Sequence, residues 1–441
     1  MTNAEEWAGR DAAVVWHGFT QMSSYGENAP VTVERAEGRE LIDVDGRRYF
    51  DGISSLWVTT LGHHVPELDA ALVDQLGRVA HSTLLGHGNR VVVEFAEALA
   101  AAVPVDGAHV LFASDGATAV EQALKIAFQY WVNRGVPERH RFLALGGAYH
   151  GDSVGALSLG DGGFGTDLFD PLRFPVVRTP GYATPDWADK AVAAIDAHAG
   201  GLAAVVLEPL VQGASGILVA EPEDVAQVGR ACREAGALLL CDEVATGFGR
   251  TGRLFASEWS GLRPDLLCLG KGITGGYLPL SATVASDEVF SAFAGADLGE
   301  RTFYHGHSYS GNALACAVAL RHLQLLEEWD VLANVTTVSR RLAGLLADRL
   351  ADRPGVGAVR QRGLMAGVEL APPPGGRRWG RRVCAAAVSR GVLLRPLGDV
   401  VVVLPPLTTT LDEIERVVDV LAASVDQVWA EDAGAEGTDG P

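Results

Sequence analysis

The stretch that decides the fold of this 441-residue chain is Ala237–Gly276, which reads ALLLCDEVATGFGRTGRLFASEWSGLRPDLLCLGKGITGG. Two short apolar runs within it, Ala237–Cys241 and Leu266–Leu269, have the length and the flanking residues of buried strands. Asp242 follows the first run, and Gly270–Lys271 follows the second. In an open α/β sheet, ligands bind just beyond the carboxyl ends of the strands. The stretch therefore predicts a carboxylate and an amine side by side at such an edge.

An acid and an amine in this arrangement suit a pyridine cofactor held as a Schiff base. Lys271 would bond the aldehyde of the cofactor, and Asp242 would keep the ring nitrogen protonated through a charge-assisted hydrogen bond. The plainer alternatives are a helix cap or surface turn for Asp242 and a solvated surface lysine for Lys271. The setting Gly270-Lys271-Gly272, at the end of an apolar strand, favours a partly buried amine whose lowered pKa makes it nucleophilic.

Composition and charge exclude several classes of function. The chain has 55 acidic and 35 basic residues and a net charge of −20, so neither nucleic acid nor an anionic membrane is an expected partner. Five cysteines lie in apolar runs without CxxC spacing and are interpreted as buried thiols in a reducing cytosol, and no histidine spacing predicts a metal site. The polar, acidic N-terminus and the absence of an apolar run of about 20 residues predict a cytoplasmic protein with no membrane span.

Strands and helices alternate through the middle of the chain. This alternation predicts a doubly wound, mostly parallel α/β sheet, followed by a smaller α+β lobe. The expected parts are an N-terminal arm with part of the small domain (1–65), a large domain (66–325), a C-terminal small domain (326–428) and a disordered tail (429–441). Near the N-terminus, Asp45-Gly46 and Asp51-Gly52 are predicted to be hairpin turns.

Two further segments follow predicted strands. The segment Ser114–Thr118 (SDGAT) opens the predicted helix Gly116–Trp131, whose first-turn amides suit a phosphate, although the segment taken alone favours an ordinary turn with a Ser or Asp cap. In Gly146–Asp152 (GGAYHGD), Tyr149 could stack on a flat ring, or the segment could be a glycine turn with a packed aromatic residue.

Two motifs suggest nucleotide binding but fit it poorly. Gly247–Gly252 matches GxGxxG, the basis of an alternative dinucleotide-dependent oxidoreductase, yet no good helix opens at Gly252. Leu269–Lys271 hints at a phosphate loop, but residue 265 is Asp where glycine is needed and residue 272 is Gly where Ser or Thr is needed.

Taken together, the motifs LLLCDEVATGFGRTGRLFASE, PDLLCLGKGITGGYLPLSAT, AYHGD and HGHSYSGNALACAVAL resemble those of the class III, fold-type I aminotransferases that depend on pyridoxal 5'-phosphate (PLP). The resemblance runs from about residue 14 to about 425. FDGISSLW, AHSTLLG, EQALKIAFQYW, LEPLVQGASGI and RPLGD narrow it to the branch that converts 8-amino-7-oxononanoate to 7,8-diaminononanoate in biotin biosynthesis. It implies a large PLP-binding domain and a smaller domain built from both termini.

The resemblance also implies roles for individual residues. Lys271 matches the Schiff-base lysine, Asp242 the partner of the pyridine nitrogen, and Tyr149 the residue that stacks on the ring and touches substrate. The phosphate site matches Gly116 and Ala117, together with His307 and Ser308 on a loop that crosses from the neighbouring subunit. The resemblance therefore implies a homodimer with shared active sites. Positions on the substrate side match Phe19, Leu56, Trp57, Asp152, Arg250, Gly306 and Arg395, of which Arg395 receives the substrate carboxylate.

Departures from the family pattern lie on the substrate side. Leu56-Trp57 stands where many members have two tryptophans, Phe19 where they have tyrosine, and His307-Ser308 where they have Pro-Thr. The amino donor is accordingly S-adenosylmethionine or lysine, and the nearest alternative is another class III aminotransferase acting on an ω-amino acid or a diamine. Decarboxylation and internal amino migration are more distant outcomes of the same chemistry.

Overall fold

The computed structural model describes residues 3–161 and 166–435. The chain divides into two compact units, each described by itself: Met1–Val65 with Ala333–Pro441 (unit 1), and Pro66–Leu332 (unit 2). The boundary predicted between residues 325 and 326 falls inside helix α10 (Ala313–Glu328), whereas the units divide after Leu332. Among the described helices, none combines the length and apolar character needed to cross a lipid bilayer.

Unit 2 is built on a sheet in which seven described strands follow the order β4-β12-β11-β10-β7-β5-β6. All neighbours are parallel except β12, which runs antiparallel to both β11 and β4. These strands are β4 (His109–Ala113), β5 (Arg141–Leu145), β6 (Val177–Thr179), β7 (Leu202–Leu207), β10 (Leu238–Asp242), β11 (Leu266–Leu269) and β12 (Ser281–Ala285). The helices are α3 (Pro66–Leu76), α4 (Arg90–Ala102), α5 (Gly116–Asn133), α6 (Val154–Leu159), α7 (Trp187–His198), α8 (Pro222–Glu234), α9 (Asp287–Ser291) and α10, and β8 (Val211–Gln212) pairs with β9 (Leu218–Val219).

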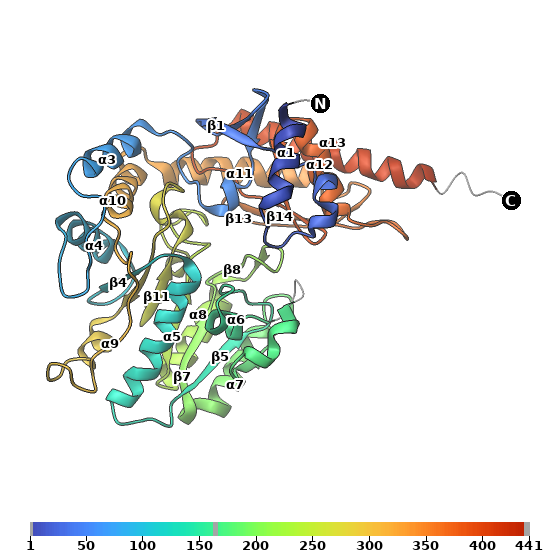
Figure 1. Cartoon of the computed structure of the whole chain (residues 1–441). Helices are drawn as coiled ribbons and strands as arrows, with labels where there is room; N and C mark the ends of the chain where they lie inside the picture. Colours follow the sequence, from blue (N-terminus) through green and yellow to red (C-terminus); the bar gives the residue numbers. More distant parts are fainter. Residues whose placement is uncertain (1–2, 162–165, 436–441) are drawn as a thin grey trace. The chain divides into compact units, whose positions relative to one another are not determined.

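Helices cover both faces of this sheet. Side chains alternate along a strand, and in β10 Leu238 and Leu240 belong to the core cluster that includes α5, whereas Leu239 lies beside Gly229 of α8. Figure 1 shows α5 along strands of this sheet, and α8 packs against β10. The predicted doubly wound, mostly parallel sheet is therefore confirmed, and its continuous apolar strands are those of a sheet buried on both sides.

Unit 1 contains two described four-stranded sheets, β1-β2-β3-β15 and β13-β14-β17-β16. Their strands are β1 (Val33–Glu37), β2 (Glu40–Asp43), β3 (Arg48–Asp51), β13 (Val356–Arg362), β14 (Met365–Leu370), β15 (Val392–Leu393), β16 (Arg395–Leu397) and β17 (Val400–Val403). The helical elements are α1 (Asn3–Val14), α2 (Ser54–Trp57), most of α11 (Val331–Arg349), α12 (Trp379–Ser389) and α13 (Leu411–Ala435). The first of these sheets combines strands from both ends of the chain, because β15 pairs in parallel with β3.

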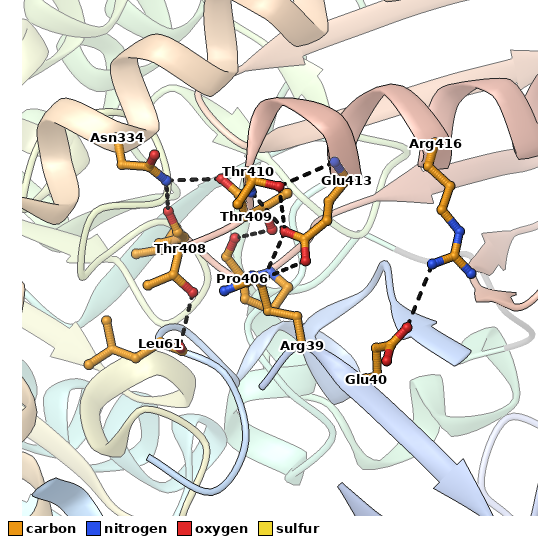
Figure 2. A network of polar contacts seen from close by, with 11 residues as sticks. Arg39, Glu40, Leu61, Asn334, Pro406, Thr408, Thr409, Thr410, Glu413 and Arg416 are labelled. Carbon is orange, nitrogen blue, oxygen red and sulfur yellow. Dashed lines mark hydrogen bonds and ion pairs between the residues drawn. The ribbon is translucent and has the colours of Figure 1, made fainter. Parts of the chain in front are cut away.

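The C-terminal segment of unit 1 is tied to its N-terminal segment by polar contacts, shown in Figure 2. The hydroxyl of Thr408 donates to the carbonyl of Leu61 at 3.0 Å, and Nε of Arg39 donates to Oε1 of Glu413 at 2.9 Å. Because these partners lie more than 340 positions apart, the contacts join the two ends of the chain within one unit.

Two expectations for unit 1 were wrong. Asp45-Gly46 does turn between β2 and β3, but Asp51 is the last residue of β3, with a buried carboxylate, and no hairpin follows it. Residues 429–435, expected in a disordered tail, continue α13: Trp429 packs edge-on against Trp379, and Asp432 accepts hydrogen bonds from Arg382. Residues 436–441 of that expected tail lie outside the described residues.

Candidate functional site

The predicted acid–amine pair lies at one edge of the unit 2 sheet. β10 and β11 run parallel, and Asp242, the last residue of β10, is opposite Cys268 of β11. Lys271 begins the short 3₁₀ helix Lys271–Thr274 that follows β11. Both side chains therefore come from the carboxyl ends of adjacent parallel strands, where the fold places ligands.

Lys271 is partly buried and has φ of 42°, a left-handed conformation that a non-glycine residue adopts only under constraint. Burial lowers the pKa of its amine, and the negative charges of Asp242 and Glu208 offset only part of this effect. A larger fraction of the amine is therefore neutral near pH 7 than in a solvated lysine.

Asp242 is 5% exposed and is held from two sides. Its Oδ1 accepts a hydrogen bond from the backbone N–H of Val244 at 3.0 Å, and its Oδ2 lies 2.7 Å from Nδ1 of His150. Burial of His150 opposes protonation, but the hydrogen bond and charge of Asp242 and the charge of Glu208 outweigh it, so the pKa of His150 is raised. The pair fixes the orientation of the carboxylate at the sheet edge.

Glu208 is a second buried carboxylate at the same edge. It follows β7, is 5% exposed, and accepts the backbone N–H groups of Tyr149 and Gly213, each at 3.2 Å. Burial raises its pKa to about 7, with the charge of nearby His150 acting in the opposite direction. Sequence reasoning did not select His150 or Glu208, although His150 lies in the segment Gly146–Asp152 after a predicted strand and Glu208 directly follows β7.

The start of α5 lies against the loop that carries Lys271. A Cβ added to Gly270 would stand 3.4 Å from Cα of Gly116, and one added to Gly151 would stand 2.4 Å from Cβ of Ala117. Small residues thus let three strand ends converge. The N–H groups of Gly116 and Ala117 precede the first intrahelical bond, from Ala119 N–H to Asp115 O, and have no acceptor among the described residues.

Tyr149 and Asp152 lie together beside this cluster. The phenol of Tyr149 donates to Oδ2 of Asp152 at 2.9 Å, and burial together with the charge of Asp152 raises the pKa of the phenol, which keeps it protonated. Arg250, in the turn region after β10, is buried. Residues 247–255 form turns followed by a 3₁₀ helix (Ala256–Ser260), and no α-helix opens at Gly252 as a dinucleotide motif needs.

The segment Gly306–Ser308 is not joined to the Lys271 cluster by any hydrogen bond or ion pair among the described residues of the chain. The carbonyl of Ser308 accepts from Nε2 of His81 at 2.7 Å, the Ser308 residue is exposed, and the rings of His305 and His307 meet edge to face. Gly306 and Ser308 are therefore exposed on the surface of unit 2, whereas His307 between them is half-buried, with its Nδ1 buried and without a partner among the described residues.

Unit 1 carries the remaining predicted site residues. Arg395 opens β16, and no anion among the described residues pairs with its half-buried guanidinium. Burial and the positive charge of Arg381 lower the pKa of Arg395, and Arg381 also donates to the carbonyl of Phe19 at 3.2 Å. Phe19 is exposed, and the remaining two residues, Leu56 and Trp57, lie in α2. An unpaired guanidinium of this kind can bind a carboxylate by donating two parallel hydrogen bonds to its oxygens.

In the described residues, no group of three or more His, Cys, Asp or Glu side chains is placed to hold a metal ion. All five cysteines are buried and free, as predicted.

Comparison with known proteins places this geometry in a family. The family model described as aminotransferase class-III matches residues 22–425. The chain is 45% identical to the adenosylmethionine-8-amino-7-oxononanoate aminotransferase of Nitratidesulfovibrio vulgaris, over 97% of this chain and 82% of that protein. The crystal structure of the enzyme of that name from Methanocaldococcus jannaschii superposes with a TM-score of 0.92 at 36% identity, covering 96% of this chain and 99% of that one.

A second solved structure is a PLP-bound amine transaminase from an uncultivated Pseudomonas species. It superposes with a TM-score of 0.87 at 32% identity, covering 94% of this chain and 99% of that one. Both the match over most of the chain and the shared fold lead to one conclusion: this chain belongs to the class-III aminotransferases.

Proposed function

We propose that this chain transfers an amino group to the ketone of 8-amino-7-oxononanoate, giving 7,8-diaminononanoate, with pyridoxal 5'-phosphate as cofactor. The amino donor is S-adenosylmethionine or lysine. The observation that carries the reaction type is the Lys271 amine and the Asp242 carboxylate at adjacent strand ends. The choice of substrate follows the names of relatives that are 36–45% identical over nearly the whole chain.

The residues at the sheet edge fit pyridoxal phosphate. The N–H groups of Gly116 and Ala117, without acceptors among the described residues, suit a phosphate at a helix N-terminus. Asp242 suits the pyridine nitrogen, Lys271 the aldehyde carbon, and the half-buried Tyr149 the ring face. When bound, the cofactor supplies an electron sink that stabilises negative charge on the amine-bearing carbon of the substrate.

The chain's own groups then divide the work. Nζ of Lys271, with its lowered pKa, removes the proton from the amine-bearing carbon of the donor and returns a proton to the carbon of the acceptor. Asp242, fixed in place by its contact with His150, would hold the proton on the pyridine nitrogen. Burial of both carboxylates, Asp242 and Glu208, excludes water that would weaken these interactions.

The substrate assignment is tested with purified protein loaded with pyridoxal phosphate. Each of S-adenosylmethionine, lysine and 4-aminobutyrate is supplied in turn as donor, with 8-amino-7-oxononanoate as acceptor, and 7,8-diaminononanoate is measured by mass spectrometry. Product with one of the first two donors is the expected result. Amino transfer to other ketones but not to this acceptor would exclude the assignment and favour an amine transaminase, like the Pseudomonas structure that shares the fold.

Arg395 is predicted to bind the carboxylate of the keto acid. In the Arg395→Gln variant, we expect KM for 8-amino-7-oxononanoate to rise about 10- to 100-fold, since a charge-assisted hydrogen bond contributes roughly 1.5–3 kcal/mol, while kcat changes less. Steady-state kinetics measure both constants. Arg390→Gln is the matched control, because Arg390 is exposed and its guanidinium donates to Ala386, Ser389 and Gln427 of its own unit. An equal rise in both variants would exclude the role.

A homodimer with shared sites is part of the proposal. It is supported by the exposure of Gly306 and Ser308 and by the exposed side chains of Tyr304 and Tyr309 beside them. In Ser308→Ala, we expect the affinity for pyridoxal phosphate to fall about tenfold. Heterodimers of Ser308→Ala with Lys271→Ala should regain activity, because one site in each then carries both native residues. A monomer in light scattering, or no regain on mixing, would contradict the shared site.

A further inference from the structure

The segment Ser54–Trp57 of unit 1 is one turn of left-handed helix built from residues other than glycine. Its φ angles are 50°, 52°, 90° and 70° along the four residues. The N–H of Trp57 donates to Ile53 O at 2.8 Å and that of Val58 to Ser54 O at 2.9 Å. In this conformation Cβ approaches the following carbonyl oxygen, so consecutive L-residues adopt it only where the surrounding structure compensates.

The side chain of Asp51 holds the middle of this turn. The carboxylate is 0% exposed and accepts three hydrogen bonds. The backbone N–H of Ser55 donates to Oδ1 at 2.9 Å, the hydroxyl of Ser55 donates to Oδ2 at 2.7 Å, and Nε2 of His63 lies 2.9 Å from Oδ2. Asp51 thus fixes both the backbone and the side chain of the second residue in the left-handed turn.

The two ends of the turn are held by the C-terminal part of the same unit. At its start, the hydroxyl of Ser54 donates to Leu404 O, and the N–H of Leu404 donates to the O of Gly52, which precedes the turn, both at 2.8 Å. After it, Thr408 donates to Leu61 O at 3.0 Å, as Figure 2 shows. Between these ends, the N–H groups of Leu56 and Trp57 donate to Ile53 O, and the side-chain hydrogen bonds that hold Ser55 come from Asp51.

We propose that Asp51 is a positioning residue whose carboxylate sets where Leu56 and Trp57 stand, and through them the fit of the long keto acid. The inference rests on the proposed function, in which these two side chains meet substrate. Leu56 is 46% exposed although apolar, whereas Trp57 behind it is buried. Asp51 also pairs with Leu393, two residues before Arg395, so one strand pair, β3 with β15, carries both the apolar turn and the guanidinium.

The test first weakens the hydrogen bonds from Asp51 to Ser55 and then relieves the backbone strain at position 55. Asp51→Asn keeps the shape of the side chain but loses the charge and one acceptor, and we expect KM for 8-amino-7-oxononanoate to rise about tenfold with kcat within about twofold. Adding Ser55→Gly should bring KM back to within about threefold, because glycine adopts positive φ without a steric penalty. Adding Ser55→Ala should give no such recovery.

Asp43→Asn is the matched control. Asp43 is 3% exposed and also accepts three hydrogen bonds, from the hydroxyl of Tyr49 and the N–H groups of Asp45 and Arg47, none of them in Ser54–Trp57. We expect it to lower the melting temperature without raising KM. An equal rise in KM for Asp43→Asn and Asp51→Asn, or equal recovery with glycine and alanine at position 55, would overturn the proposal.

Two further measurements keep the test decisive. If Asp51→Asn does not fold, the single variants Ser55→Ala and Ser55→Gly replace it: a higher KM for alanine supports the proposal, and equal values overturn it. If the wild-type protein does not turn over this keto acid, the proposed substrate fails, but a crystal structure of Asp51→Asn still decides the inference. Loss of positive φ at Ser55 and Leu56 supports it, and an unchanged turn overturns it.

Discussion

The Lys271→Ala variant is expected to lose amino transfer by at least ~10⁴-fold while keeping its fold and its ability to bind pyridoxal phosphate. The substitution removes an amine that has two roles, as the nucleophile and as the group that moves the proton at the reacting carbon. Proton transfer alone contributes about 10²–10⁴-fold to the rate. No other lysine can substitute, because the remaining two, Lys125 and Lys190, lie on helices α5 and α7 away from the strand ends. The measurement is single-turnover formation of the aminated product.

Lys190→Ala is the control for this variant. Lys190 is an exposed residue whose amine lies 3.0 Å from Asp186, and its loss should leave the rate within about twofold, since such surface pairs contribute little. Addition of a small primary amine such as methylamine should restore part of the rate to Lys271→Ala but not change that of Lys190→Ala. Full activity in Lys271→Ala would exclude the proposed role of this amine.

The central sheet of unit 2 could be predicted from the sequence because each strand is decided by local residues. The predicted strand Leu266–Leu269 has the bounds of β11, and the predicted strand Ala237–Cys241 differs from β10 by one residue at each end. Strands buried on both faces of a parallel sheet are continuous apolar runs that stop at polar or glycine-rich turns, so their ends can be recognised in the sequence. The edge at which Asp242 and Lys271 meet follows from those ends.

The features that sequence reasoning missed are decided by distant partners. The left-handed turn at Ser54–Trp57 contains no glycine to mark it, and its support comes from Asp51 nearby and from Leu404, 350 positions from Ser54. The end of α13 looked disordered because its acidic, small residues carry no signal of Arg382, which pairs with Asp432. In both places the local composition contradicts the conformation that tertiary contacts impose.

The candidate site was predictable to different depths. Asp242 and Lys271 follow from strand ends alone, whereas Phe19, Leu56 and Arg395 were reached only through the family resemblance. Their segments lie in unit 1, and no periodicity relates them to the sheet of unit 2. His150 and Glu208 are an intermediate case: both follow strands, but nothing in the sequence selects them, because their charges meet only when β5, β7 and β10 lie in one sheet.

The Asp242→Asn variant is expected to lower the rate of amino transfer by about 10³-fold. The amide carries no charge, so it cannot hold a proton on the pyridine nitrogen, and breaking a buried ion pair on one side costs roughly 3–5 kcal/mol. Single-turnover rates and the pH dependence of the bound cofactor's absorbance measure the effect. Asp265→Asn is the matched control: Asp265 is a largely buried carboxylate that precedes β11 and accepts the N–H of Leu239, an acceptor role that asparagine can keep.

The pH dependence of the stability of the cofactor-free protein tests the same substitution independently. In the wild type, the folded-state pKa of His150 is raised above its ordinary 6.5, so the stability that its pairing with Asp242 contributes is present below about pH 6.5 and is lost as pH rises through the folded pKa. The difference in free energy of unfolding between wild type and Asp242→Asn should therefore be largest near pH 5–6 and should narrow at higher pH. A difference that stays constant with pH, while Asp265→Asn behaves in the same way, would mean that His150 is not protonated against Asp242. The carboxylate would then be held by the N–H of Val244 alone, and its charge at the pyridine nitrogen would have to be maintained without the histidine.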